Sequence, residues 1–131
     1  MYEEDCSAKE WKTFGESYII INGIVLTLKK VEFSRVAIPE KVVQLSCGMS
    51  HCLARTSLHK VYGWGDNSNG QLGVGHSKRV KNPKLLDWFS KQAITIQQTA
   101  ATAYGSVALD SNSRIFWWGT NGTISCLPTP K

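Results

Sequence analysis

Short apolar stretches separated by glycine, asparagine and serine recur along the whole chain. These stretches are too short for helices and are typical of β-strands. Asn22-Gly23 stands between Ile21 and Ile24, and this dipeptide favours a type I′ hairpin turn, in which both central residues have positive φ. The pattern therefore predicts an all-β chain of successive antiparallel hairpins.

The predicted strands fall into three groups along the chain. Those of the first group cover residues 11–14, 18–21, 24–29 and 32–38, before Pro39. Those of the second group cover residues 42–47, 51–56 and 61–64, with an outer strand over 84–88 after Pro83 or, alternatively, one helical turn over 85–91. Those of the third group cover residues 94–96, 104–109 and 114–118, and we expect the chain to stop before a fourth strand.

A sequence repeat underlies these groups. A small or apolar residue, a tight turn and an apolar strand follow one another in residues 14–21, 47–54 and 101–108. A second element, rich in aromatic residues and glycine, occurs in residues 60–67 and 114–121. Gly119 follows Gly65 by 54 residues, and Ala108 follows Ala54 by the same interval. A repeat of about 50 residues made of short strands is typical of propeller blades or a related array.

The repeat divides the chain into a lead-in and three blades. These segments are an N-terminal lead-in (1–8), a degenerate blade (9–39), a well-matched blade (40–91) and a truncated blade (92–131). We therefore expect a partial β-propeller of antiparallel four-stranded blades whose ring is incomplete. Because ring closure removes sheet edges, such an arc would expose strands at both ends. A longer product, a second chain that completes the ring, or a stack of three units with capped ends would resolve this exposure.

Charge adds a candidate binding surface. The 131 residues are 42% hydrophobic and 19% charged, as in ordinary globular domains, and the net charge is +5. Much of the excess lies at Lys78, Arg79, Lys81 and Lys84. Such a cluster can contact an anionic partner, either phosphate or an acidic protein surface, or it can be a solvated loop.

The ends and the apolar runs bear on the compartment. The N-terminus is acidic, whereas a signal peptide begins with basic residues, and no apolar run is long enough to span a bilayer. We therefore expect an intracellular protein without a membrane span, in the nucleus, cytoplasm or cilium. In such a compartment the four cysteines are not expected to form disulfides. Cys47 and Cys52 lie near His51 and His59 but lack the spacing of zinc ligands, so no metal and no cofactor are predicted.

Residues 46–51 followed by residues 60–73 resemble the repeats of the regulator of chromosome condensation family. This resemblance implies the blades of a seven-bladed β-propeller. The repeat motif comprises Gly15, Gly48, His51, Trp64, Gly65, Gly70, Gln71, Leu72, Gly73, Trp118 and Gly119. The third unit lacks the Gly-Gln-Leu-Gly sequence, and the first lacks the Trp-Gly step. We expect a structural role for the motif, with Leu72 filling the gap between blades and the His51 ring bonding a nearby backbone group.

Sequence motifs of catalysis are missing. The chain has no Gly-x-Ser-x-Gly elbow, Gln71 stands where the lysine of a phosphate-binding loop would be, and the ten acidic residues are scattered. We therefore expect no catalytic residues and no enzyme. Exchange-factor activity is not excluded by this, because it would need no catalytic side chain.

We expect a protein-interaction module, a scaffold or assembly component whose protein partners include chains that complete the propeller. The resemblance also implies two alternatives. One is a guanine-nucleotide exchange factor, or a fragment of one, for a small GTPase. The other is chromatin or nucleic-acid binding through the basic loop, which the acidic N-terminus and the absence of interleaved aromatic residues disfavour.

Overall fold

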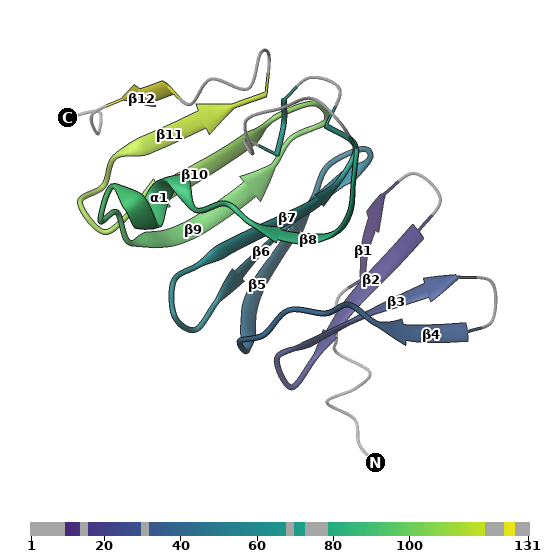
Figure 1. Cartoon of the computed structure of the whole chain (residues 1–131). Helices are drawn as coiled ribbons and strands as arrows, with labels where there is room; N and C mark the ends of the chain where they lie inside the picture. The colour runs from purple at the N-terminus through teal and green to yellow at the C-terminus, as the bar shows by residue number, and fades with distance from the viewer. Residues whose placement is uncertain are drawn as a thin grey trace.

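The computed structural model describes residues 10–13, 16–29, 32–67, 70–72, 79–119 and 125–127. They form three four-stranded antiparallel sheets and one short helix. The sheets follow one another in the chain and fan out side by side, with the strands of each sheet in a meander (Figure 1). The predicted all-β fold with blade-like four-stranded sheets is confirmed, and the described residues form an arc without a closed ring.

Each sheet pairs its strands in chain order. The first sheet contains β1 (Glu10–Thr13), β2 (Glu16–Ile21), β3 (Ile24–Lys29) and β4 (Glu32–Arg35). The second contains β5 (Val42–Cys47), β6 (His51–Thr56), β7 (Val61–Gly65) and β8 (Val80–Leu85). The third contains β9 (Ile96–Ala101), β10 (Ser106–Asp110), β11 (Ile115–Trp118) and β12 (Ser125–Leu127). The predicted turn at Asn22-Gly23 is confirmed, because both residues have positive φ (53° and 78°).

The outer strand of the second sheet differs from the prediction over residues 84–88. It begins earlier, at Val80, and runs through Pro83, whereas Trp88–Lys91 form the helix α1. Within the described residues β8 pairs only with β7, so Pro83 can lack a backbone donor there without breaking the ladder. The alternative prediction of one helical turn over residues 85–91 agrees better with the structure than a strand over 84–88 does.

The third sheet also departs from expectation, because it has a fourth strand. β12 pairs with β11 through Ile115 opposite Leu127, so the expectation that this unit ends before a fourth strand is wrong. A strand of three residues carries too little periodicity to be recognised from its sequence.

Cys47 and Cys52 form a disulfide, contrary to the expectation of unpaired cysteines. They lie directly opposite each other in the β5–β6 register, with their Cα atoms 4.1 Å apart. The Gly48 N–H donates to the His51 carbonyl oxygen and closes the tight turn that brings the two cysteines together. The register of the hairpin, which composition does not reveal, decides this pairing.

The second and third sheets repeat each other at the interval of 54 residues. Trp64 pairs with Cys52 as Trp118 pairs with Ser106, and the glycine after each tryptophan has positive φ, 109° at Gly65 and 144° at Gly119. A Cβ at Gly65 would lie 2.5 Å from the Ser50 carbonyl oxygen, and one at Gly119 would lie 2.8 Å from the equivalent oxygen of Tyr104. The positive φ and the nearby carbonyl oxygen therefore require glycine at both positions.

The turns after β6 and β10 show the same equivalence with different side chains. The Thr56 hydroxyl accepts the backbone N–H groups of Leu58 and Lys60, at 3.3 and 3.2 Å. In the third sheet, Asp110 Oδ1 accepts those of Asn112 and Arg114, at 3.0 and 2.7 Å. The left-handed residues also coincide, with φ of 63° at His59 and 64° at Ser113. A shared backbone geometry thus persists where the sequence identity is lost.

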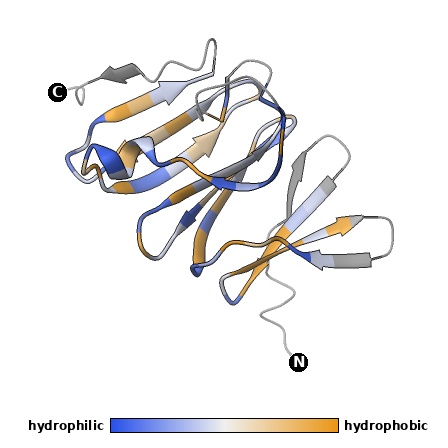
Figure 2. Cartoon of the chain, in the orientation of Figure 1, coloured by the Kyte–Doolittle hydropathy of each residue, from blue (hydrophilic) through white to orange (hydrophobic). Residues whose placement is uncertain are grey.

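Apolar side chains collect where neighbouring sheets meet. Hydrophobic and hydrophilic segments alternate along several strands in Figure 2, as expected when one face of each strand is covered. Leu53 and Leu72 are fully buried, and both approach Gly63, where a Cβ would lie 3.0 Å from Leu72 Cδ2. The core therefore lies mainly between sheets and not within any one of them.

We predict that Gly65→Ala lowers the free energy of unfolding by about 1–3 kcal/mol, because its φ is rarely adopted by residues with a Cβ and the new methyl group would press on Ser50. Urea denaturation measures this loss, and Gly119→Ala should behave alike. Ser111→Ala, at an exposed turn position, is the control and should change stability by less than about 0.5 kcal/mol. Equal stability of Gly65→Ala and the wild type would contradict the requirement for glycine at this position.

Candidate functional site

The contact between the second and third sheets, here called the polar seam, is built on the side-chain amide of Gln44. Its Nε2 donates to the Thr99 carbonyl oxygen at 3.2 Å, and its Oε1 accepts the Thr99 N–H at 3.0 Å. Gln44 thereby pairs with both backbone groups of one β9 residue, Thr99, as a neighbouring strand would. Arg55 Nε donates a hydrogen bond to Gln44 Oε1 at 3.0 Å, and the Ser46 hydroxyl donates to the same Thr99 oxygen at 3.0 Å.

His51 extends the polar seam toward the tight turns. Its Nε2 lies 3.0 Å from the Gly105 carbonyl oxygen, which can only accept, so Nε2 carries the proton. The Ser106 hydroxyl lies 3.2 Å from Nε2 and donates to the Gln71 carbonyl oxygen at 2.5 Å. The expected bond from His51 to a backbone group is confirmed. Its Nδ1 is buried and has no hydrogen-bond partner among the described residues.

The Gly70, Gln71 and Leu72 part of the repeat motif joins the seam through its backbone. Asn67 shapes this turn, because its carbonyl oxygen accepts the Gly70 N–H and its Oδ1 accepts the Leu72 N–H, both at 3.0 Å. Leu72 is fully buried beside Gly63. These contacts support the structural role expected for the motif, whereas its residues Gly15 and Gly73 lie outside the described residues.

The two tryptophans of the repeat motif occupy equivalent places in different seams. Trp64 contacts Tyr18 of the first sheet edge-on, with ring centroids 5.6 Å apart. Trp118 contacts Phe89 of α1, with centroids 5.5 Å apart, and Phe89 also packs on Phe116. The helix α1 therefore fills the space beside Trp118 with aromatic rings. Gly48 completes the motif beneath His51, where a Cβ would lie 2.6 Å from the ring Cε1.

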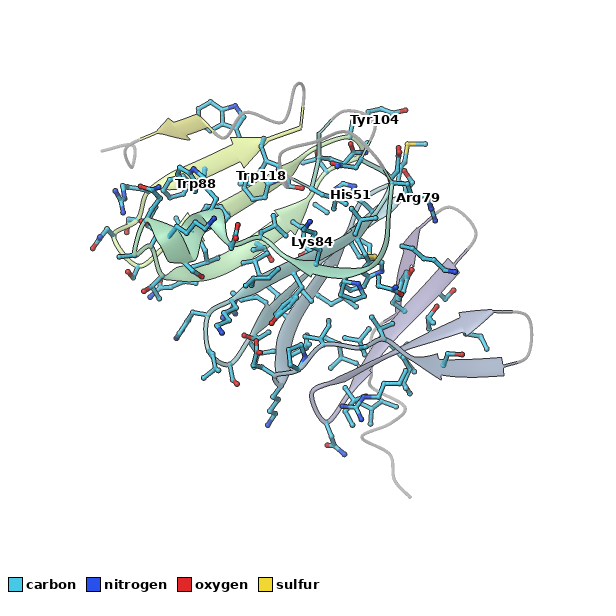
Figure 3. All side chains as sticks on the ribbon, viewed as in Figure 1. His51, Arg79, Lys84, Trp88, Tyr104 and Trp118 are labelled. Carbon is cyan, nitrogen blue, oxygen red and sulfur yellow. A yellow bond between two sulfur atoms is a disulfide. The ribbon has the colours of Figure 1, made fainter. Side chains whose placement is uncertain are left out.

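The predicted anionic-partner residues separate into two groups. Arg79 and Lys81 line a cleft of about 490 Å³ between the first and second sheets, together with Arg35 from the end of β4. Lys84 lies on the same strand β8 but does not line the cleft, and Lys78 lies outside the described residues. Figure 3 shows Arg79 and Lys84 at separate places along β8 and its approach. Sequence reasoning missed Arg35, because nothing near it marks it as a partner of a distant basic segment.

A second surface was also missed, the outer face of the third sheet. It carries Gln98, Ala100, Val107, Leu109, Ile115 and Trp117, which face one another across β9, β10 and β11. Trp117 is 38% exposed, and Val107, Leu109 and Ile115 are partly exposed. On the second sheet Leu53 and Val61, the equivalents of Val107 and Ile115, are almost wholly buried. The third sheet lies at one end of the described arc, and this position leaves its apolar residues partly exposed.

Neither a metal centre nor a membrane-spanning helix is found in the part of the chain that the structure describes. No group of three or more metal-ligating side chains gathers within those residues. No helix among them is long and apolar enough to cross a membrane.

We predict that Gln44→Ala lowers the free energy of unfolding by about 1–3 kcal/mol, because the Thr99 N–H loses its partner inside the seam and the Thr99 carbonyl oxygen keeps only the Ser46 hydroxyl. Chemical denaturation measures the loss. Gln98→Ala is the matched control, since Gln98 is the equivalent residue 54 positions later and is exposed. Similar losses for both variants would contradict the assigned role of Gln44.

We predict that stability falls as the pH is lowered below about 6.5. Burial lowers the pKa of His51 from its ordinary value of 6.5, although the Gly105 carbonyl and the Asp66 carboxylate act in the opposite direction. The unfolded chain therefore binds a proton before the folded chain does, and stability is lost between pH 6.5 and the lower folded pKa, by up to about 1.4 kcal/mol per pH unit. Thermal melting across this range should show a weaker slope for His51→Gln. The same slope in both proteins would refute the prediction.

Comparison with known proteins agrees with this geometry. Sequence profiles of the "Regulator of chromosome condensation (RCC1) repeat" match residues 59–109 and 42–71. The X-linked retinitis pigmentosa GTPase regulator of Canis lupus familiaris is 36% identical over 76% of this chain, and the ultraviolet-B receptor UVR8 of Arabidopsis thaliana is 37% identical over 60% of it. The aligned part spans only 10% and 18% of those two proteins.

Solved structures agree on the fold. Human WBSCR16 superposes with a TM-score of 0.77 over 88% of this chain and 37% of its own, at 21% identity. A chain in the structure of Kap60 bound to yeast RCC1 (Prp20) gives a TM-score of 0.78 over 94% of this chain and 35% of that chain, at 16% identity. The repeated glycine-tryptophan geometry, the family profiles and these superpositions coincide, and this chain belongs to the regulator of chromosome condensation (RCC1) repeat family.

Proposed function

We propose that this chain is a protein-interaction module, a β-propeller segment that docks another blade of the same repeat type against the outer face of its third sheet. The observation that carries the proposal is the exposure of this face. Its residues Val107 and Ile115 are partly exposed, whereas their equivalents in the second sheet, Leu53 and Val61, are covered. An apolar sheet face of this kind favours a protein partner.

Gln98 indicates which part of the partner this face can bind, namely the backbone of a β-strand. It stands 54 residues after Gln44, and on the third sheet it lies opposite Leu109 on the outer face. Gln44 binds both backbone hydrogen-bonding groups of one residue, Thr99, in the first strand of the next sheet, β9. Gln98 can hold an inner strand in the same way, which supports another blade as the occupant. The activity proposed is binding, and it requires no nucleophile and no general base.

A second copy of the chain is the probe for this surface, because its sheets are blades of the required type. Sedimentation equilibrium should give a mass above the 14.5 kDa of one chain that rises with concentration. Trp117→Arg places a charge on the exposed apolar face and should return the protein to 14.5 kDa. Leu58→Arg, at an exposed turn position of 60% exposure, is the control and should leave the association unchanged. A wild-type chain of 14.5 kDa at every concentration would contradict the proposal.

Regulation of a small GTPase is the second candidate. It is favoured by two similar proteins, one of which is named a GTPase regulator. The other is Prp20p of Saccharomyces cerevisiae, whose solved structure is described together with its binding properties to Gsp1p and histones. Acceleration of nucleotide release from a panel of small GTPases would support this candidate. The absence of any acceleration across the panel would remove it.

A further inference from the structure

The cleft between the first and second sheets, here called the cationic cleft, is a separate site. Tyr18 and Thr27 line it from the first sheet. His51, Trp64 and residues 79–83, which include the first part of β8, line it from the second. Its volume of about 490 Å³ is in the range of small ligand-binding pockets, which span about 300–1,000 Å³. Both walls are strands of the two sheets, so the site is held by the fold and not by a single loop.

The cleft exists because the two seams are filled differently. In the seam between the second and third sheets, Phe89 from α1 covers Trp118. The connection 36–41 between β4 and β5 is shorter than the connection 86–95 and contains no helix. Trp64 therefore packs against Tyr18 alone among the described aromatic rings, and both residues line the cleft.

Among the residues that the structure describes, the charge of the lining has one sign. Arg35, Arg79 and Lys81 are exposed cations of the lining, and no aspartate or glutamate is found among its described members. None of the three cations forms an ion pair with a residue that the structure describes. Asp66 lies near His51, but it bonds the Ser50 hydroxyl at 3.4 Å and is not part of the lining. Such a cleft concentrates positive potential and favours an anionic ligand.

Buried polar atoms of the lining also lack partners. Four side-chain nitrogen or oxygen atoms are buried without a hydrogen bond among the described residues, and three belong to the lining: Thr27 Oγ1, His51 Nδ1 and Trp64 Nε1. The fourth is Trp118 Nε1, at the equivalent place in the third sheet. Unpaired buried groups of this kind are uncommon, because each costs about 1–3 kcal/mol. His51 Nδ1 is an acceptor, since Nε2 carries the proton, and Trp64 Nε1 is a donor.

We propose that the cationic cleft binds an acidic peptide segment of a partner protein, with a carboxylate side chain entering between Arg35, Arg79 and Lys81. The cleft lies beside β4 and β8, whose outer edges pair with no other strand among the described residues, and such an edge can accept an extended peptide. Its volume admits a few side chains but not a base-paired helix, which favours a peptide over nucleic acid. This site does not depend on the outer face of the third sheet, so either proposal can fail alone.

Fluorescence anisotropy with a short labelled glutamate-rich peptide tests the proposal at moderate salt. Arg79→Glu and Lys81→Glu should each weaken binding by about tenfold or more, because each reverses a charge that contacts the carboxylates. Lys84→Glu is the matched control, since it makes the same charge change on β8 outside the cleft, and it should weaken binding by less than about threefold. Equal losses in all three variants would mean diffuse attraction and would overturn the proposal.

Three further measurements decide the class of ligand and the place where it binds. A glutamine-rich peptide of the same length should not bind, and equal binding would overturn the requirement for carboxylates. Duplex DNA that binds more tightly and displaces the peptide would assign the surface to nucleic acid and overturn the peptide. In NMR spectra, the indole N–H signal of Trp64, identified through Trp64→Phe, should shift on peptide addition, whereas that of Trp118 should not. An unshifted Trp64 signal with bound peptide would place the peptide elsewhere and overturn the site.

Discussion

No sheet of this protein can bury both of its faces alone, and this constraint governs the rest of the structure. A four-stranded sheet has two faces, and the buried core here lies mainly between sheets. Each sheet is therefore stable only against a neighbour. The side-chain amide of Gln44 turns this general need into a specific contact, because it pairs with both backbone groups of Thr99 in the adjacent sheet.

The two seams between the sheets and the outer face of the third sheet show three outcomes of that constraint. The polar seam is closed by Gln44, His51 and the aromatic rings of α1. The seam between the first and second sheets is closed only in part, and the cationic cleft remains beside Trp64. The outer face of the third sheet is uncovered. Both proposed binding sites lie where the repeat leaves its own packing incomplete, which explains how a structural repeat can bind partners without catalytic residues.

Much of the fold was predictable from local patterns. The β3, β5 and β6 boundaries match the predicted ranges, because a type I′ turn and tight glycine turns bracket clearly apolar strands. β9 was largely missed, since Gln97, Gln98 and Thr99 look like a loop. Thr99 is buried by its bond to Gln44, 55 residues earlier. β8 was displaced in the prediction because a strand that contains Lys81 and Pro83 has no apolar periodicity.

The sequence by itself determined the repeat interval of 54 residues, the turns that need glycine, and the residues that form the motif. These are properties of short segments, in which backbone sterics and side-chain alternation act within a few residues of each other. Tertiary structure alone decided that Arg35 joins Arg79 and Lys81, and that Trp117 is exposed while Leu53 is buried. Those outcomes depend on which sheet lies against which, and this is set only when segments distant in the sequence pack together.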